Sequence, residues 1–114
     1  MTRRDILPGM LDMLILKTLS VQAMHGYGIA GQLRDQSKEV IHVEEGSLYP
    51  ALQRMRQKGW IRSEWQQTAN NQRARYYEIT PKGRRQLGEL DKAFSELMTA
   101  VRRIMRPATG SPGV

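Results

Sequence analysis

The side chains best placed to do chemistry in this chain lie along residues 45–57, EGSLYPALQRMRQ. The apolar residues of this segment recur at i, i+3, i+4 and i+7, which is the spacing of a helix that buries one face. The opposite face carries polar, aromatic and cationic groups without an acid: Tyr49, Pro50, Gln53, Arg54 and Gln57. Side chains of these kinds meet phosphates and base edges, so the segment predicts a helix that binds in a DNA major groove, with Ser47 at its start.

The start and the end of this helix follow from two residues. Pro50 lacks an N–H group, which costs nothing in the first turn of a helix because those groups have no partner there. We therefore expect Ser47 to be the first helical residue. Gly59 stands where a helix terminator is expected.

Catalytic and metal chemistry find little support in the sequence. His25 and His42 each stand alone in their segments, without the i, i+4 partner of a helical metal site. The pair Glu44-Glu45 is typical of a helix start, where acids favour the helix dipole. The chain has no Cys, which excludes disulfides and thiolate zinc sites. We expect no enzyme, no catalytic residue, no metal and no cofactor.

Residues 26–31, GYGIAG, match the G-x-G-x-x-G fingerprint of dinucleotide-binding folds. That fold needs a parallel sheet of several strands, whereas the chain after Val43 offers a helix, one hairpin and a last helix. Lys17, in the segment that would form the first strand, is also unsuited to a strand buried on both faces. We interpret Gly26 and Gly28 instead as residues that shape the turn between two helices.

Charge and length narrow the class of protein further. The chain has 114 residues and a net charge of +7, which favours a polyanionic partner. Its 18 cationic residues are mostly arginines, whose forked guanidinium groups suit phosphate and guanine. The apolar run 10–19 contains Asp12 and Lys17 and is too short to cross a bilayer. We expect a cytoplasmic protein that does not bind membranes.

The remaining elements follow from periodicity and turn residues. We predict helices over 9–21 and 27–37, a short extended link over 40–43, and a hairpin with strands 60–65 and 73–79. Ile29, Ala30 and Leu33 should face inward, and Asn70-Asn71 can supply positive φ angles in the hairpin turn. Thr80 and Pro81 have the types of a helix cap and a first helical residue.

The last helix, predicted over about 81–105, carries an unusual apolar pattern. Its apolar residues alternate in steps of three and four, which is the narrow seam of a coiled coil. At ~1.5 Å per residue the helix would be roughly 37 Å long, more than the preceding domain can cover. We therefore predict a homodimer formed by this helix, with an interface of Leu87, Leu90, Phe94, Leu97, Val101 and Ile104. Residues 107–114 are predicted to be a disordered tail.

Three helices, a hairpin and a further helix are the element order of a winged helix-turn-helix. The predicted fold class is mainly α with a small β-hairpin wing (α+β), with a DNA-binding domain over 1–80 and a C-terminal dimerisation helix over 81–106. The wing carries Arg73 and Arg75, with Arg62 on the other strand, and these cations can reach phosphates beside the groove. An RNA-binding protein or a scaffolding dimer with this fold stays open as an alternative.

The sequence resembles the short subtype of the PadR family of transcriptional regulators. The resemblance lies in residues 14–19, 25–29, 43–52, 59–61, 73–77 and 79–84, and the string GSLYPAL at 46–52 is highly specific. It implies a winged-helix repressor that binds double-stranded DNA at a palindromic operator as a homodimer. It also implies that Tyr49 and Pro50 touch DNA, that the wing arginines touch its backbone, and that a small hydrophobic or aromatic effector releases it. Only Phe94 is aromatic in the last helix, so no stacking pocket is expected there.

Overall fold

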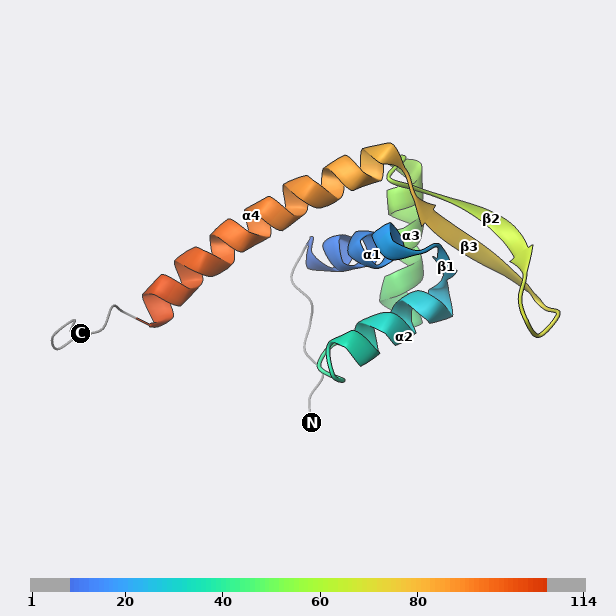
Figure 1. The fold of residues 1–114 in the computed structure, drawn as a ribbon, viewed down its shortest axis with the longest axis horizontal. Coiled ribbons are helices and arrows are strands. Elements are labelled where there is room, and N and C mark those ends of the chain that lie inside the picture. Colours follow the sequence, from blue (N-terminus) through green and yellow to red (C-terminus); the bar gives the residue numbers. More distant parts are fainter. Residues whose placement is uncertain (1–8, 107–114) are drawn as a thin grey trace, which may run out of the picture.

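The computed structural model describes residues 9–106, which form four helices and a small sheet (Figure 1). The expected disordered tail over 107–114 lies outside the described residues. In chain order the elements are α1 (Met10–Val21), β1 (Met24–His25), α2 (Gly26–Gln36), α3 (Glu45–Gln57), β2 (Ile61–Gln67), β3 (Arg73–Ile79) and α4 (Pro81–Met105). The predicted fold class, a winged helix with a long C-terminal helix, is confirmed.

The core lies where the first three helices meet the sheet. α1, α2 and α3 each contribute fully buried aliphatic side chains, as their apolar spacing predicted. Ile29 and Leu33 of α2 are buried, and Ala30 packs beside them as a half-buried residue. The apolar stripe of α3 is buried over its whole length: Leu48, Ala51, Leu52 and Met55.

The predicted start of α3 was wrong by two residues. The helix begins at Glu45, because the carbonyl of Glu44 already accepts hydrogen bonds from the N–H groups of Ser47 and Leu48 at 3.0 and 2.9 Å. Pro50 consequently lies inside the helix and not in its first turn. Pro50 has no N–H group to donate to the carbonyl of Gly46, four residues earlier. Both residues are exposed, so this carbonyl remains accessible to water.

The sheet contains a strand that the sequence did not predict. Its order is β1-β3-β2, and β1 pairs antiparallel with β3 through Met24–Tyr77 and His25–Tyr76. A strand of two residues is too short to show an alternating pattern. All pairings of the sheet are antiparallel and the glycines of 26–31 lie within α2, so a dinucleotide-binding fold is excluded for the described chain.

The hairpin and the ends of its neighbouring helices agree with the predicted turn chemistry. β2 pairs with β3 from Ile61–Ile79 to Gln67–Arg73, so the first strand is longer and the loop shorter than expected. Asn71 has a φ of 63° in the turn, and Gly59 has a φ of 78° just after α3. The segment expected to extend over 40–43 forms no strand in the described chain.

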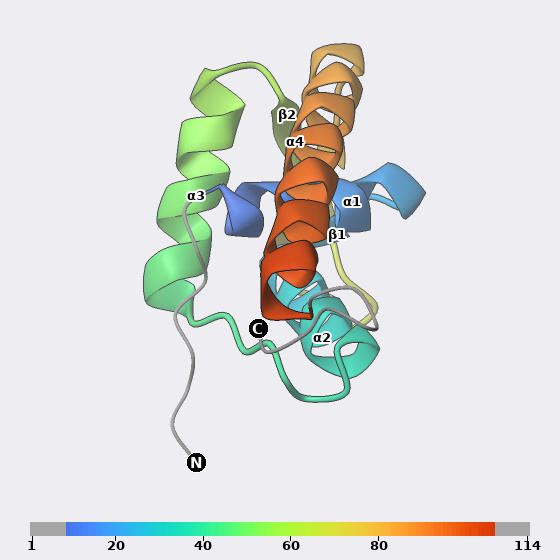
Figure 2. The same cartoon turned by 90° about the vertical axis from the view of Figure 1, so that its left-hand side faces the viewer.

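α4 begins as predicted and then leaves the body of the protein. The Thr80 hydroxyl accepts a hydrogen bond from the N–H of Gly83 at 3.0 Å, and Pro81 is the first helical residue. Leu87 and Leu90 pack against the core, and α1 lies against this first part of the helix. The rest of α4 projects away on the side opposite the hairpin, as two perpendicular views show (Figures 1 and 2).

None of the described helices is both long enough and apolar enough to cross a membrane.

Candidate nucleic-acid interface

The outward face of α3 presents the side chains that the sequence predicted there. Four of these residues are well exposed, and Tyr49 is 38% exposed: the four are Ser47, Pro50, Gln53 and Gln57. The buried stripe Leu48–Met55 fixes the rotation of the helix about its axis, so these residues share one side. α3 therefore offers a polar surface, with its acids confined to the N-terminal end at Glu44 and Glu45.

Arg54, a predicted DNA contact, is held by a residue of α1. Its Nη1 and Nη2 donate hydrogen bonds to Oδ2 and Oδ1 of Asp12 at 2.8 and 2.9 Å. The Asp12 side chain is only 13% exposed, whereas that of Arg54 is 46% exposed. The bonds to Asp12 raise the pKa of the Arg54 guanidinium further above its usual value. Of its five N–H donors, three remain for another partner.

Arg56 is a cation beside this face that the sequence did not single out. It is half-buried, and its Nη2 donates a hydrogen bond to Oε1 of Gln53 at 3.0 Å. The bond orients the Gln53 amide, one of the predicted base contacts. The i, i+3 spacing of Gln53 and Arg56 was the signal that could have shown this.

Tyr49 leans from α3 onto the start of α2. A Cβ atom added to Gly26 would collide with the Tyr49 hydroxyl and lie 2.8 Å from Cζ, so the ring rests directly on the glycine backbone. Burial raises the pKa of the Tyr49 hydroxyl, and Tyr77 and Glu45 add to the rise. His25 fixes the start of α2. Its Nδ1 accepts a hydrogen bond from the N–H of Gly28 at 3.0 Å and so caps the helix.

Tyr49 lies in a groove of about 620 Å³. The groove is bounded by α3, by the start of α2 and by the face of the hairpin that carries Trp65, Arg73 and Arg75, here called the inner face. The groove walls combine aromatic rings with cations and amides, and no Asp or Glu of the described chain lines it. Its aromatic and cationic lining consists of His25, Tyr27, Tyr49, Trp65, Tyr77, Arg73 and Arg75. Such a lining suits a polyanion with planar groups.

The two predicted wing arginines lie together in this groove around one tryptophan. The guanidinium carbons of Arg73 and Arg75 lie 5.1 and 5.0 Å from the ring centroid of Trp65. The register explains the cluster: Trp65 pairs with Arg75 and Gln67 with Arg73, so the three side chains share one face. Trp65 was placed in a strand from the sequence, but its contact with both arginines was missed.

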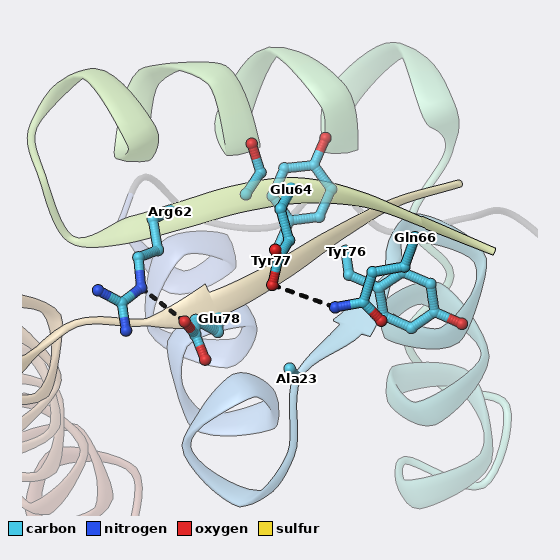
Figure 3. Close-up of a pocket in the computed structure, with 8 residues that line it drawn as sticks. Ala23, Arg62, Glu64, Gln66, Tyr76, Tyr77 and Glu78 are labelled. Carbon is cyan, nitrogen blue, oxygen red and sulfur yellow. Dashed lines mark hydrogen bonds and ion pairs between the residues drawn. The ribbon is translucent and has the colours of Figure 1, made fainter. Parts of the chain in front are cut away.

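The outer face of the same hairpin has the opposite character. A pocket of about 320 Å³ there contains Glu64 and Glu78 (Figure 3). Arg62 Nε donates to Glu78 Oε1 at 2.5 Å and Gln66 Nε2 to Glu64 Oε1 at 3.2 Å. Arg62 is thus neutralised on the far side of the sheet, away from the groove, and the hairpin has one cationic and one acidic face.

The exposed part of α4 carries the second half of the predicted dimer seam. Phe94 is half-buried, and Leu97 and Ile104 are 55% and 75% exposed. Leu87 and Leu90, the first two seam residues, already pack within the protomer. Among residues 9–106, no three His, Asp or Glu side chains gather closely enough to hold a metal ion.

Comparisons with known proteins agree with this geometry. The Transcriptional regulator PadR-like family matches residues 15–89. An uncharacterised protein of Lysinibacillus sphaericus is 30% identical over 97 residues, which are 85% of this chain and 89% of that protein. The structure resembles a transcriptional regulator from Clostridium thermocellum, with a TM-score of 0.79 and 26% identity over 88% of this chain and 97% of that one. It also resembles a PadR-like transcriptional regulator from Bacillus cereus, with a TM-score of 0.75 and 29% identity over 88% and 95% of the two chains.

Proposed function

Since the chain belongs to the Transcriptional regulator PadR-like family, we propose that it is a DNA-binding repressor that acts on a palindromic operator as a homodimer. Members of this family regulate transcription and are not enzymes. A chromosomal operator as the partner implies a cytoplasmic protein. The acid-free groove between α3 and the hairpin is the observation that carries the proposal.

The proposed contacts divide into base and backbone contacts. The outward face of α3 lies in the major groove, where its side chains contact base edges: Ser47, Tyr49, Pro50, Gln53 and Gln57. Arg73 and Arg75 bind phosphates beside it from the inner face of the wing. Arg54 uses its remaining N–H donors on the DNA while Asp12 orients its guanidinium.

The dimer in this proposal forms through α4. Its exposed apolar residues extend beyond the part of the helix that the protomer covers, and a second copy of the helix would bury them. Two α3 helices related by two-fold symmetry read two half-sites, about 34–36 Å or a multiple of that distance apart. The operator is therefore a palindrome.

Release of the operator by a small hydrophobic or aromatic compound is the last part of the proposal. Met98 and Met105 lie on the exposed half of α4, where flexible thioether side chains could adapt to an apolar compound. Such a ligand would act by changing the spacing of the two α3 helices across the dimer.

Selection of bound sequences from random duplex DNA at a fixed salt concentration tests the function. We expect a two-fold symmetric consensus, a footprint of one or two helical turns, and an affinity that falls steeply with salt. A protein scaffold would enrich no sequence. Preference for single-stranded or hairpin RNA over every selected duplex would favour the RNA-binding alternative.

A further inference from the structure

We propose that Trp65 is a positioning residue, which holds Arg73 and Arg75 in the orientation that binds consecutive phosphates. This inference rests on the proposed DNA-binding function. Trp65 is 53% exposed, so its ring is only partly used by the core. The exposed part of the ring is therefore available to other side chains of the wing.

The ring of Trp65 contacts two such side chains. Both guanidinium groups lie within the ~6 Å range in which a cation is attracted to the face of an aromatic ring, at 5.1 and 5.0 Å from its centroid. Stacking uses the flat face of a guanidinium and leaves its N–H edge free to donate. One tryptophan therefore orients two donors without consuming their hydrogen bonds.

The acids of the hairpin do not compete for these donors. Within residues 9–106, neither Arg73 nor Arg75 forms an ion pair, and the only side-chain hydrogen bond of Arg75 is a long one of 3.5 Å to Ser63 Oγ. Glu64 and Glu78 lie on the outer face, where Glu78 accepts a hydrogen bond from Arg62. The inner face thus keeps two oriented cations free of carboxylates.

Ordering both arginines before DNA binds should increase the affinity for DNA. An arginine that is ordered only on binding loses side-chain entropy at that step, which weakens binding. Trp65 restricts both arginines before DNA arrives, so this entropy is already lost in the free protein. Removing the ring should weaken binding by about 5- to 30-fold while both positive charges remain.

The first experiment measures binding of a selected operator duplex by fluorescence anisotropy over a series of salt concentrations. Trp65→Leu should lower affinity about 5- to 30-fold without changing the slope of log affinity against log salt. Arg73→Gln with Arg75→Gln should lower both the affinity and the slope, by ~0.9 for each phosphate that is no longer neutralised. Arg62→Gln is the control, because it removes one positive charge from the outer face of the same hairpin, and it should stay within about twofold of wild type.

The combination of variants separates positioning from direct contact. In the background Arg73→Gln with Arg75→Gln, Trp65→Leu should cause no further loss, because no arginine is left to orient. An undiminished further loss would show that the Trp65 ring itself contacts the DNA and would overturn the proposal. Wild-type affinity of Trp65→Leu would overturn it as well.

A measurement on the free protein keeps the proposal testable even if duplex DNA is not the partner. In nuclear magnetic resonance spectra, ring currents of Trp65 should shift the side-chain signals of Arg73 and Arg75 away from those of solvated arginine. Both sets of signals should return to solvated values in Trp65→Leu, while Trp65→Phe should keep part of the shift. Unshifted signals in the wild-type protein would refute the positioning role, whereas failure of all duplex binding with shifted signals would refute only the proposed function.

Discussion

Arg54 of α3 and Asp12 of α1 are joined by two parallel hydrogen bonds of 2.8 and 2.9 Å. The two residues are 42 positions apart in sequence, and the carboxylate is mostly covered. A fork of this kind fixes both direction and distance between the helices that carry it. The helix proposed to read DNA is therefore tied to the helix that lies against α4.

The ion pair should be measurable as a coupling in protein stability. Arg54→Gln and Asp12→Asn should each lower the free energy of unfolding by about 1 kcal/mol, because the guanidinium is half exposed and its attraction is screened by water. The double variant should cost little more than one of them, as each change already breaks the pair. Urea unfolding at one fixed protein concentration measures this, and fully additive losses would mean that the pair contributes nothing.

The same two variants distinguish a contact of Arg54 with DNA from a purely orienting role. Arg54→Gln should weaken operator binding by roughly 1–3 kcal/mol, because it removes the guanidinium. Asp12→Asn should weaken it clearly less, since Arg54 remains in place to meet the DNA. Anisotropy titrations with operator and mixed-sequence duplexes provide the comparison. Equal losses in both variants would show that Arg54 only orients α3, and equal losses on both duplexes would limit it to phosphate.

The Tyr49 ring lies directly against Gly26, so a substitution of this glycine should affect DNA binding. Gly26→Ala would place a methyl group against the Tyr49 hydroxyl and force the ring out of its position in the groove. We expect at least tenfold weaker binding, which corresponds to about 1.4 kcal/mol. Gly31→Ala in the same helix is the control, because its nearest new contact is Nη2 of Arg34 at 3.8 Å, an ordinary van der Waals distance. Unchanged affinity of Gly26→Ala would remove Tyr49 from the proposed interface.

Two glycines of α4 should respond in opposite directions to alanine. A Cβ on Gly83 would collide with the Trp60 carbonyl and lie 2.8 Å from Ile79 Cγ1, so Gly83→Ala should destabilise the fold by ~1–3 kcal/mol or more. Gly88 has open space at that position, and Gly88→Ala should stabilise the exposed helix by ~0.5–1 kcal/mol. Thermal unfolding of both variants tests this, and equal melting temperatures would contradict the close approach of α4 to the sheet.

The proposed dimer depends on the exposed half of α4. Leu97→Asp would bury an unpaired carboxylate between the two helices and weaken association by roughly 3 kcal/mol or more, so operator binding should fall with it. Thr99→Asp carries the same charge on the other side of the helix and should leave the dimer intact. Sedimentation equilibrium at micromolar concentration decides the outcome. A Leu97→Asp variant that stays dimeric would place the interface elsewhere.

The sequence by itself determined the elements whose signals are local and periodic. The stripe of Leu48, Ala51, Leu52 and Met55 defined the face of α3, because a helix repeats every 3.6 residues wherever it occurs. Gly59, Thr80 and Pro81 marked helix ends through backbone angles and missing hydrogen bonds that belong to those residues alone. The bounds of α4 followed from the same signals.

Other features were decided only by the tertiary structure, because their partners are distant in sequence. β1 exists because β3 offers it hydrogen bonds, and two residues by themselves have no pattern. α3 begins early enough in the chain to leave Pro50 inside the helix, since a solvated carbonyl at Gly46 makes that position tolerable.

The candidate interface shows the same division most clearly. Arg54, Arg73 and Arg75 could be selected from the sequence as cations on suitable elements. Helix packing decided that Arg54 pairs with a carboxylate. Strand register decided which arginines stack on Trp65 and which face of the wing is free of acids. Residue type sets what a side chain can bind, but the folded chain decides which partner it meets first.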